Sequence, residues 1–187
     1  MQIENTNLEG VFLIKPKIFG DNRGFFFESY HENRYQNFKM FPRFVQDNMS
    51  RSSQGTLRGL HYQLNQPQCK LLSVMRGSIF DVAVDIRVGS PTFGQWYGAI
   101  LDDENHNQLF ISEGFAHGFY VLSEVADVHY KCSDYYAPHD EHGILWDDKD
   151  LGIDWPLFNF APILSQKDSL NKKLSDMEKS NLPKFTK

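Results

Sequence analysis

A histidine in a glycine-bounded strand pattern is the residue of this sequence best suited to acid–base chemistry. The segment 55–63 reads GTLRGLHYQ and contains His61. Successive side chains of a β-strand point to opposite faces, so Leu57, Gly59, His61 and Gln63 share one face. If that face lines a barrel interior, the imidazole of His61 can remove a proton from a bound molecule. A histidine satisfied by hydrogen bonds in a β core is the alternative that this segment leaves open.

Three further residues have side chains that could complete such chemistry. Asp168 could orient His61 and stabilise its charged form, or it could cap the amphipathic segment that follows it. Tyr130 is a weak acid with a reference pKa of about 10 and could return a proton to carbon, or it could be an ordinary core tyrosine. Lys70 lies among apolar residues of a strand pattern. Its charge either reaches the surface or points into a cavity, where it would stabilise an enolate oxygen.

A second histidine raises the question of a metal site. His117 lies in a glycine-flanked strand segment, 113–119. Metal-binding cupin barrels usually combine a His-x-His pair with a nearby glutamate and a later histidine. Here Gln63 stands where the second histidine of the pair would be, and no glutamate occurs in the next ten residues. Because a catalytic metal usually needs three protein ligands, the sequence predicts no metal.

These residues must be positioned by strands, which dominate the pattern from about residue 10 to residue 135. The clearest strand alternates an apolar face with a face containing Asp81, Ala83 and Asp85. Further strands are expected at 96–101, 108–111, 115–122 and 127–131, with turns at 89–91, 102–107 and 112–114. Many short strands at regular turn spacing predict a sandwich, jelly roll or barrel. Two helical segments are expected outside the strands, at 31–38 and 168–179.

Length and composition define the class of protein. The 187 residues suit one domain spanning 1–187, with a loosely ordered tail at 180–187. A net charge of -5 argues against nucleic-acid binding, although Arg23 and Arg58 could still contact a small phosphorylated ligand. Two cysteines, Cys69 and Cys132, make no disulfide framework. The N-terminus lacks a secretory pattern and no apolar run could span a membrane, so a cytoplasmic protein is expected.

The segments read together resemble the dTDP-4-dehydrorhamnose 3,5-epimerase family. The similarity extends from about residue 5 to residue 175 and keeps the family's order of motifs. The matching segments are 21–25 (DNRGF), 46–50 (QDNMS), 55–63, 80–87 (FDVAVDIR), 89–94 (GSPTFG), 114–119 (GFAHGF), 130–136 (YKCSDYY), 143–148 (GILWDD) and 165–168 (SQKD).

The resemblance implies a fold, a substrate and a reaction. The fold is all-β, a metal-free cupin-like jelly roll, or double-stranded β-helix, with a few short peripheral helices. The substrate is a dTDP-4-keto-6-deoxyhexose, and the two carbons flanking its ketone are inverted without a cofactor. The product expected from dTDP-4-keto-6-deoxy-D-glucose is dTDP-4-keto-L-rhamnose, on the route to dTDP-L-rhamnose. The family also implies a homodimer in which N-terminal strands are exchanged.

The resemblance further implies residue roles. His61 is the base, Asp168 its partner, Lys70 the enolate stabiliser and Tyr130 the acid. The substrate contacts implied by the family are Arg23, Glu28, Gln46, Asp47, Asn48, Arg58, His117, Glu141 and Lys167. We expect part of this second set to reach the site of the other subunit.

Three alternatives stay open. A single-carbon epimerase acting on a related 4-keto sugar would use the same residues. A metal-dependent cupin enzyme would lose its activity on chelation. A sugar-nucleotide-binding module would keep ligand affinity when His61 is replaced by alanine, with nothing else lost.

Overall fold

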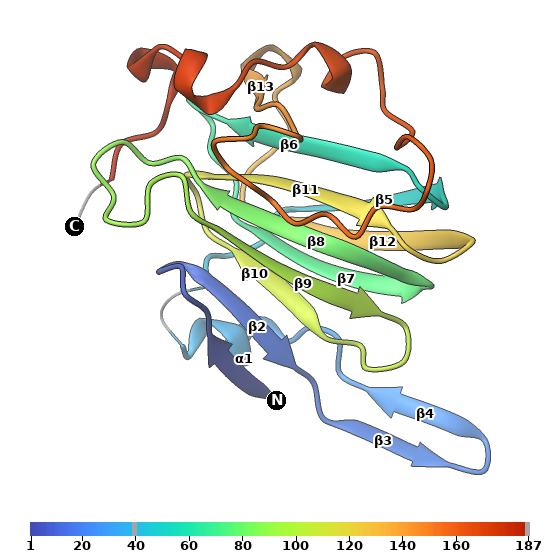
Figure 1. The fold of residues 1–187 in the computed structure, drawn as a ribbon. Coiled ribbons are helices and arrows are strands. Elements are labelled where there is room, and N and C mark those ends of the chain that lie inside the picture. The colour runs from blue at the N-terminus through green and yellow to red at the C-terminus, as the bar shows by residue number, and fades with distance from the viewer. Residues whose placement is uncertain (39–40, 186–187) are drawn as a thin grey trace.

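The computed structural model describes residues 1–38 and 41–185, and its main feature is a pair of antiparallel β-sheets that face each other (Figure 1). The larger sheet has six strands, in the order β1 (Gln2–Asn5), β2 (Val11–Lys15), β10 (Gln108–Ile111), β7 (Lys70–Arg76), β12 (Val125–Cys132) and β5 (Gln46–Ser53). The smaller sheet has five strands, in the order β13 (Glu141–Gly143), β6 (Leu57–Gln63), β11 (Phe115–Val121), β8 (Ser78–Asp85) and β9 (Trp96–Asp102). The all-β fold and the strands expected from residue 78 to residue 132 are confirmed.

The space between the sheets contains the largest apolar cluster. Its members come from both sheets, for example Val11 and Leu72 from one and Ile79 and Leu101 from the other. Alternation along each strand directs these side chains inward. Full burial of each such aliphatic side chain contributes roughly 1.5–3 kcal/mol of transfer free energy. This cluster therefore holds together the two walls from which the functional side chains project.

The outer face of the five-stranded sheet is covered by the C-terminal part of the chain. Val82, Val84 and Ile86, which belong to the apolar face expected from the alternating pattern, pack there against residues that include Leu174 and Leu182. Figure 1 shows this C-terminal segment, in orange and red, lying over β6 and β13.

The end of the chain is anchored by a buried side chain and a backbone bridge. Leu182 is only 4% exposed, and Lys184 forms a parallel bridge with Val88. An apolar side chain and strand-like pairing thus hold residues 180–185 against the rest of the chain. Residues 186–187 lie outside the described part of the chain.

The two helical predictions had different outcomes. The expected helix at 31–38 is present as α1 (Glu32–Gln36), and Tyr35 anchors it over the outer face of the six-stranded sheet. Besides a 3-10 turn at η1 (Pro138–Asp140), the described residues contain two such turns where one helix was expected, η2 (Asp168–Leu170) and η3 (Leu174–Asp176), and a further turn at its end, η4 (Lys179–Asn181). Among the described residues, no helix is long and apolar enough to cross a membrane.

Tertiary pairing explains why 168–179 is not one helix. The backbone of Lys172 is extended and bridges to Ile144, and the amide of Leu145 donates to the carbonyl of Lys172 at 2.8 Å. The carboxylate of Asp148 then accepts a hydrogen bond from the amide of Leu174 at 2.9 Å. Local helical spacing is outweighed by these contacts with a distant segment, as tertiary context often does.

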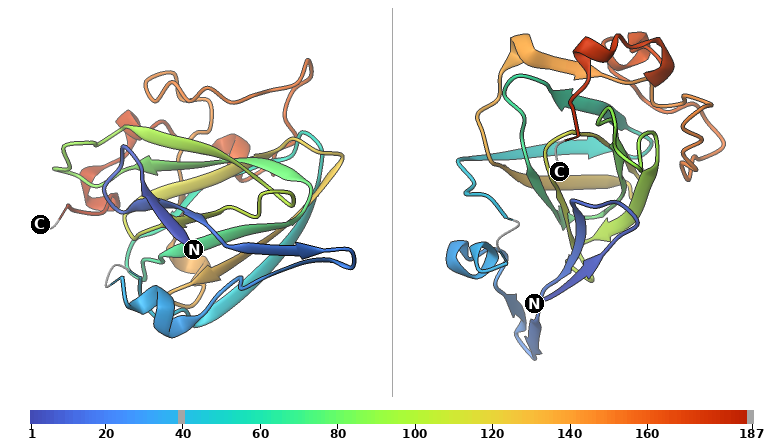
Figure 2. Two further views of the ribbon diagram at one scale, coloured as in Figure 1. Left: turned by 90° about the horizontal axis from the view of Figure 1, so that it is seen from below. Right: turned by 90° about the vertical axis from the view of Figure 1, so that its left-hand side faces the viewer.

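A hairpin formed by β3 (Ile18–Asp21) and β4 (Gly24–Phe27) projects away from the two sheets (Figures 1 and 2). Within the described residues, these strands pair only with each other. Phe25 and Phe26 on the hairpin are 61% and 69% exposed. The hairpin therefore presents large apolar side chains to solvent.

Candidate active site

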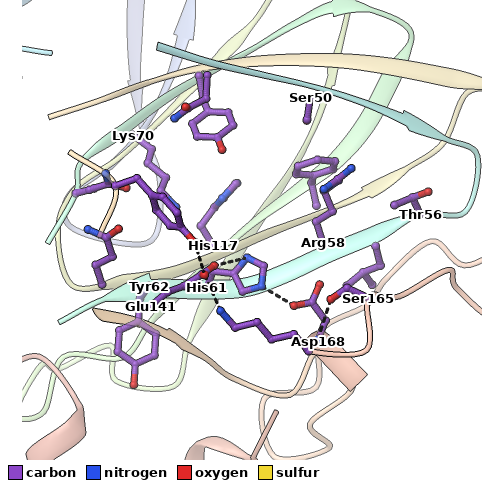
Figure 3. Close-up of a pocket in the computed structure, with 18 of the residues that line it drawn as sticks. Ser50, Thr56, Arg58, His61, Tyr62, Lys70, His117, Glu141, Ser165 and Asp168 are labelled. Carbon is purple, nitrogen blue, oxygen red and sulfur yellow. Dashed lines mark hydrogen bonds and ion pairs between the residues drawn. The ribbon is translucent and has the colours of Figure 1, made fainter. Parts of the chain in front are cut away.

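A cavity of about 560 Å³ lies between the two sheets, and most of the predicted functional residues line it (Figure 3). The five-stranded sheet contributes Arg58, His61, His117 and, from its edge strand β13, Glu141. The six-stranded sheet contributes Gln46, Asn48, Lys70 and Tyr130, and the segment before and within η2 contributes Ser165, Lys167 and Asp168. Residues more than a hundred positions apart in the sequence, such as His61 and Asp168, thus line the same cavity.

His61 and Asp168 form a direct pair. The Nε2 atom of His61 lies 2.5 Å from Oδ1 of Asp168, whose side chain is almost completely buried. Burial alone would raise the pKa of Asp168, but hydrogen bonds to His61 and Ser165 and the nearby His61 charge lower it overall. Because an ionised carboxylate only accepts hydrogen bonds, Nε2 must carry the proton of the neutral ring. The unprotonated nitrogen is therefore Nδ1.

The position of Asp168 also decides between its two predicted roles. It lies within the first turn of η2, and its own backbone amide donates to Oγ of Ser165 at 3.0 Å. Asp168 is therefore not the capping residue of that turn. Its carboxylate instead points toward the imidazole in the cavity.

Glu141 lies on the other side of the His61 ring. Its Oε1 is 3.8 Å from Nδ1, while its Oε2 accepts hydrogen bonds from the Tyr136 hydroxyl at 2.8 Å and from Nζ of Lys167 at 2.6 Å. Burial raises the pKa of Glu141, but Lys167, Tyr136 and His61 outweigh it, so the pKa is lowered. An imidazolium formed at His61 would thus have a carboxylate near each nitrogen.

A second histidine–carboxylate pair lies deeper in the cavity. Nε2 of His117 is 3.0 and 3.1 Å from the two carboxylate oxygens of Asp81, and both residues are buried. Burial, with Lys70 and His61 nearby, lowers the pKa of His117 despite the opposing effect of Asp81. Asp81 was missed as a functional residue. The sequence did contain a signal: Asp81 lies on the second face of β8, a strand whose two faces are both buried, and a buried carboxylate usually has a partner.

Lys70 and Tyr130 extend from adjacent strands of the six-stranded sheet into the same cavity. Among the described residues, neither side chain has a hydrogen-bond partner or a salt bridge within 4 Å. Burial lowers the pKa of Lys70, although Cys132, Glu141 and Asp81 oppose the shift. Burial also raises the pKa of Tyr130, which keeps its hydroxyl protonated. The lysine is therefore directed into the cavity and not to the surface.

A bulge in β6 brings Arg58 to the same cavity as His61. His117 pairs with His61 and Phe119 pairs with Arg58, so two residues of β6 oppose Gly118 alone. The strict alternation predicted for residues 57–63 is therefore wrong, because an extra residue reverses which side chains face inward. Gln63 faces the cavity wall but is held by backbone groups: it donates to the carbonyl of Gln66 and accepts from the amide of Ala137.

Three predicted substrate contacts lie away from this cavity. Arg23 is on the β3–β4 hairpin and pairs with Asp21, and Glu28 follows the hairpin and pairs with Arg34. Asp47 points outward from β5 to Lys131 at 2.9 Å, opposite to the inward Gln46 and Asn48. The structure therefore does not bring these three together with His61 within one chain.

Two further observations concern ligands. Among residues 1–38 and 41–185, no group of three or more histidine, cysteine or acidic side chains is arranged to hold a metal ion. Both cysteines are unpaired thiols, and burial raises the pKa of each. The titratable groups available around the cavity are therefore two histidine–carboxylate pairs, a lysine and a tyrosine, which can transfer protons and stabilise charge.

The chain is similar to characterised sugar-nucleotide epimerases along nearly its whole length. A family model described as dTDP-4-dehydrorhamnose 3,5-epimerase matches residues 5–176. The dTDP-4-dehydrorhamnose 3,5-epimerase of Pseudomonas aeruginosa is 51% identical over 179 residues, with 95% of this chain and 98% of the relative covered.

Solved structures give the same picture. A dTDP-6-deoxy-D-glucose-3,5-epimerase from Legionella pneumophila, in complex with dTDP-4-keto-L-rhamnose, superposes with a TM-score of 0.96 at 53% identity, covering 100% of this chain and 99% of that one. A 3'-monoepimerase from Streptomyces bikiniensis, in complex with dTDP-quinovose, superposes with a TM-score of 0.90 at 36% identity, covering 96% and 91%. The cupin-like fold expected from the sequence is confirmed by these matches.

Proposed function

The chain belongs to the dTDP-4-dehydrorhamnose 3,5-epimerase family, and from this premise we propose which of its residues perform the inversion. As a member, it is an epimerase of dTDP-rhamnose biosynthesis that acts on carbons 3 and 5 of dTDP-4-keto-6-deoxy-D-glucose to give dTDP-4-keto-L-rhamnose. A hydrogen beside a ketone is acidic because the resulting enolate spreads its charge onto oxygen. The reaction therefore needs a base, a group that stabilises the enolate and an acid.

His61 is the proposed base, acting through Nδ1. The support is its hydrogen bond to the ionised Asp168, which keeps the proton on Nε2 and leaves the lone pair on Nδ1. When Nδ1 takes a proton from carbon, Asp168 and Glu141 stabilise the imidazolium. This arrangement resembles in logic the histidine–carboxylate pair of other enzymes, in which the carboxylate sets the tautomer and orientation.

Lys70 is the proposed partner of the developing enolate oxygen. Its ammonium group lines the cavity, and within the described residues no carboxylate lies within ion-pair distance. A buried cation aimed at the atom where charge develops is worth about 10²–10³-fold in kcat for comparable donors. His117, held by Asp81, is positioned beside it to hydrogen bond with the sugar.

Tyr130 is the proposed acid. It projects from β12 of the six-stranded sheet, whereas His61 projects from β6 of the other sheet, so the two residues come from opposite walls of the cavity. Inversion at carbon requires that the proton leave one face and return to the other. A base and an acid on opposite walls meet this requirement.

The nucleotide end of the substrate is assigned to the remaining polar residues. Arg58, Lys167, Gln46, Asn48 and Glu141 line the same cavity and provide donors and acceptors for diphosphate and sugar. Asp47 remains a prediction of the family resemblance.

We propose that the whole chain acts as one domain within a homodimer, and that Arg23 and Glu28 serve the partner's site. Support comes from the β3–β4 hairpin, which carries Arg23 away from the cavity of its own chain and exposes Phe25 and Phe26. An isolated two-stranded hairpin gains little stability by itself, so an exposed one favours a partner.

The observation that carries the proposed mechanism is the His61–Asp168 pair facing Tyr130 across one cavity. To test it, the protein is incubated with dTDP-4-keto-6-deoxy-D-glucose in heavy water, and the recovered sugar nucleotide is weighed by mass spectrometry. We expect two deuterons to be incorporated, one at each carbon beside the ketone. A matched sample with His61→Ala should take up no more than the control without enzyme, and uptake at the wild-type rate would contradict the assigned base.

A second candidate is single-carbon epimerisation. The structural likeness to the 3'-monoepimerase favours it, although that likeness is weaker than the likeness to the double epimerase from Legionella pneumophila. Incorporation of a single deuteron, with the second carbon unlabelled after prolonged incubation, would favour this candidate over the double inversion.

A further inference from the structure

The inward face of β5 carries a row of polar side chains along the wall of the cavity. Its members are Gln46, Asn48, Ser50 and Ser52, at every second position of the strand, and the first three line the cavity. Gln46 donates to Asn48 at 2.9 Å, and Nε of Arg58 donates to Ser52 at 3.0 Å. Ser50 differs from its neighbours: its hydroxyl is buried and has no hydrogen-bond partner among the described residues.

An unpartnered buried hydroxyl is unusual and has a cause worth seeking. Most buried side-chain polar atoms in proteins have a partner, since leaving one unpaired costs folding free energy. Ser50 lines the cavity and lies directly opposite Val128 in the sheet, so the residue paired with it offers no polar side chain, and the hydroxyl forms no hydrogen bond with Tyr130 from the same strand. This hydroxyl is therefore a donor in the cavity wall that no side chain of the described residues uses, and a bound molecule could accept from it.

The neighbourhood of Ser50 indicates the charge of that partner. Ser50 lies on β5 between Asn48 and Ser52, the residue to which Arg58 donates. In Figure 3, Ser50 is on the side of the cavity away from Asp168, and Arg58 lies between the two. Arg58 is exposed, and within the described residues its guanidinium has no carboxylate partner. A guanidinium next to a hydroxyl donor forms a pair of donors for an anionic oxygen.

We propose that Ser50 contacts the substrate, its hydroxyl donating a hydrogen bond to a diphosphate oxygen that Arg58 also binds. The proposal rests on the proposed function, which supplies the diphosphate. The hydroxyl is closed to water in the empty cavity, so binding requires neighbouring side chains to shift. Arg58, long and exposed, would shift when it turns from Ser52 to the phosphate, and the sugar would occupy the opposite end beside His61 and Lys70.

The test is Ser50→Ala, measured with dTDP, which has the diphosphate but no sugar. Titration calorimetry should show affinity for dTDP weakened about tenfold, in line with the loss of one hydrogen bond to a charged group. With the full substrate, KM should rise by a similar factor while kcat stays within about twofold, because this contact is made equally in ground and transition states. The Tm should stay the same or rise, since an unpaired buried hydroxyl has been removed from the free protein.

The matched control is Ser53→Ala on the outward, exposed face of the same strand, which should leave dTDP affinity and KM unchanged. Unchanged dTDP affinity in Ser50→Ala would overturn the proposal. So would a fall in kcat with dTDP affinity preserved, because the contact would then be with the sugar. Deuterium uptake by the wild-type protein reports the epimerase separately, so a failure of the proposed function is distinguished from a failure of this inference.

Discussion

At the scale of residues, the central feature is the imidazole of His61, which lies between two carboxylates, one within hydrogen-bond distance and the other farther away. Asp168 accepts directly from Nε2 of His61, whereas Glu141 lies 3.8 Å from Nδ1 and is itself held by Tyr136 and Lys167. The near carboxylate sets the tautomer, and the far one leaves room at Nδ1 for a substrate hydrogen. This difference in distance allows a single histidine to be both oriented and accessible.

The first prediction concerns Asp168→Asn. An asparagine can donate its amide hydrogen to Nε2, which would move the ring proton to Nδ1 and remove the lone pair that acts as base. By analogy with the same change in a serine-protease triad, we expect kcat to fall by about 10³–10⁴-fold. Turnover and deuterium uptake measure the effect, and the exposed Asp176→Asn, on the neighbouring turn η3, is the control. Activity within tenfold of wild type would show that Asp168 does not set the tautomer.

The second prediction separates the two proton transfers. In Tyr130→Phe the base remains, so deuterium exchange at the carbons beside the ketone should continue. Net inversion should fall by about 10²–10⁴-fold, the usual contribution of a positioned acid. The inverted product is measured through a coupled reduction of its ketone, and deuterium exchange is measured by mass spectrometry. The control is Tyr135→Phe, at an exposed tyrosine. If exchange and inversion are lost together, Tyr130 positions the substrate and is not the acid.

At the scale of elements, the bulge of β6 decides which side chains face the cavity. It depends on Gly59, which has a φ of 119° and lies so close to β11 that an added Cβ would be 2.6 Å from Cα of Gly118 and 2.7 Å from the carbonyl oxygen of His117. Both contacts are with backbone atoms, so neither neighbour can turn aside. Close approach of two strands at this point places Arg58 and His61 on the same wall.

The third prediction follows from that contact. Gly59→Ala should lower the free energy of unfolding by about 3 kcal/mol or more, because backbone strain and steric overlap add together. Gly94→Ala is a matched control: its φ is also positive, at 78°, but nothing lies within 4 Å of its added Cβ. It should cost only about 1–2 kcal/mol, the strain of the left-handed backbone alone. Chemical denaturation measures both, and equal losses in the two variants would rule out the steric contribution.

Another element depends on a buried carboxylate at the end of β8. Asp85 accepts hydrogen bonds from Arg87, Ser90 and Thr92, and so holds the turn that leads to β9. Burial alone would raise the pKa of Asp85, but these hydrogen bonds outweigh it and lower the pKa. A depressed folded-state pKa stabilises the protein above the unfolded-state value, near 3.9, and this stabilisation is lost as the pH falls.

The fourth prediction is therefore pH-dependent. At pH 7, Asp85→Asn should lower the free energy of unfolding by about 3–5 kcal/mol, since it leaves a buried arginine without its partner. The difference between wild type and variant should begin to shrink as the pH falls through about 4, where Asp85 of the unfolded chain takes up a proton, and should keep shrinking until the folded carboxylate is protonated at a still lower pH. Urea denaturation across that range, with the exposed Asp150→Asn as control, measures it. A difference that does not change with pH would contradict the assignment of the stabilisation to the charge.

At the scale of the whole molecule, the chain separates a cavity between its sheets from a projecting hairpin. The cavity uses residues from both sheets and the C-terminal segment, whereas Arg23 on the hairpin is 85% exposed at its side chain. Such an arrangement makes sense if the hairpin completes a site that belongs to another subunit, as closed symmetric dimers permit.

The fifth prediction tests that exchange by complementation. Arg23→Ala and His61→Ala subunits, each poorly active alone, should regain about a quarter of wild-type activity when co-expressed, because half of the dimers then contain one intact site. Co-expression of His61→Ala with Lys70→Ala should restore nothing, since both residues line the cavity of one chain. No recovery in the first mixture, with mixed dimers verified by differential tags, would show that Arg23 does not serve the partner's site.

The sequence by itself indicated the β class, the strands from residue 78 to residue 132, the short helix α1 and the identity of most of the titratable side chains around the cavity. It could do so because alternation along a strand is a property of the local backbone, and because the motifs keep their order along the chain. Only the tertiary structure gave the distance and tautomer of the expected His61–Asp168 pair, paired Asp81 with His117 and turned Arg58 inward. It also divided 168–179 into short turns. Those outcomes depend on register, a bulge and contacts between distant segments, and local residue spacing contains no information about them.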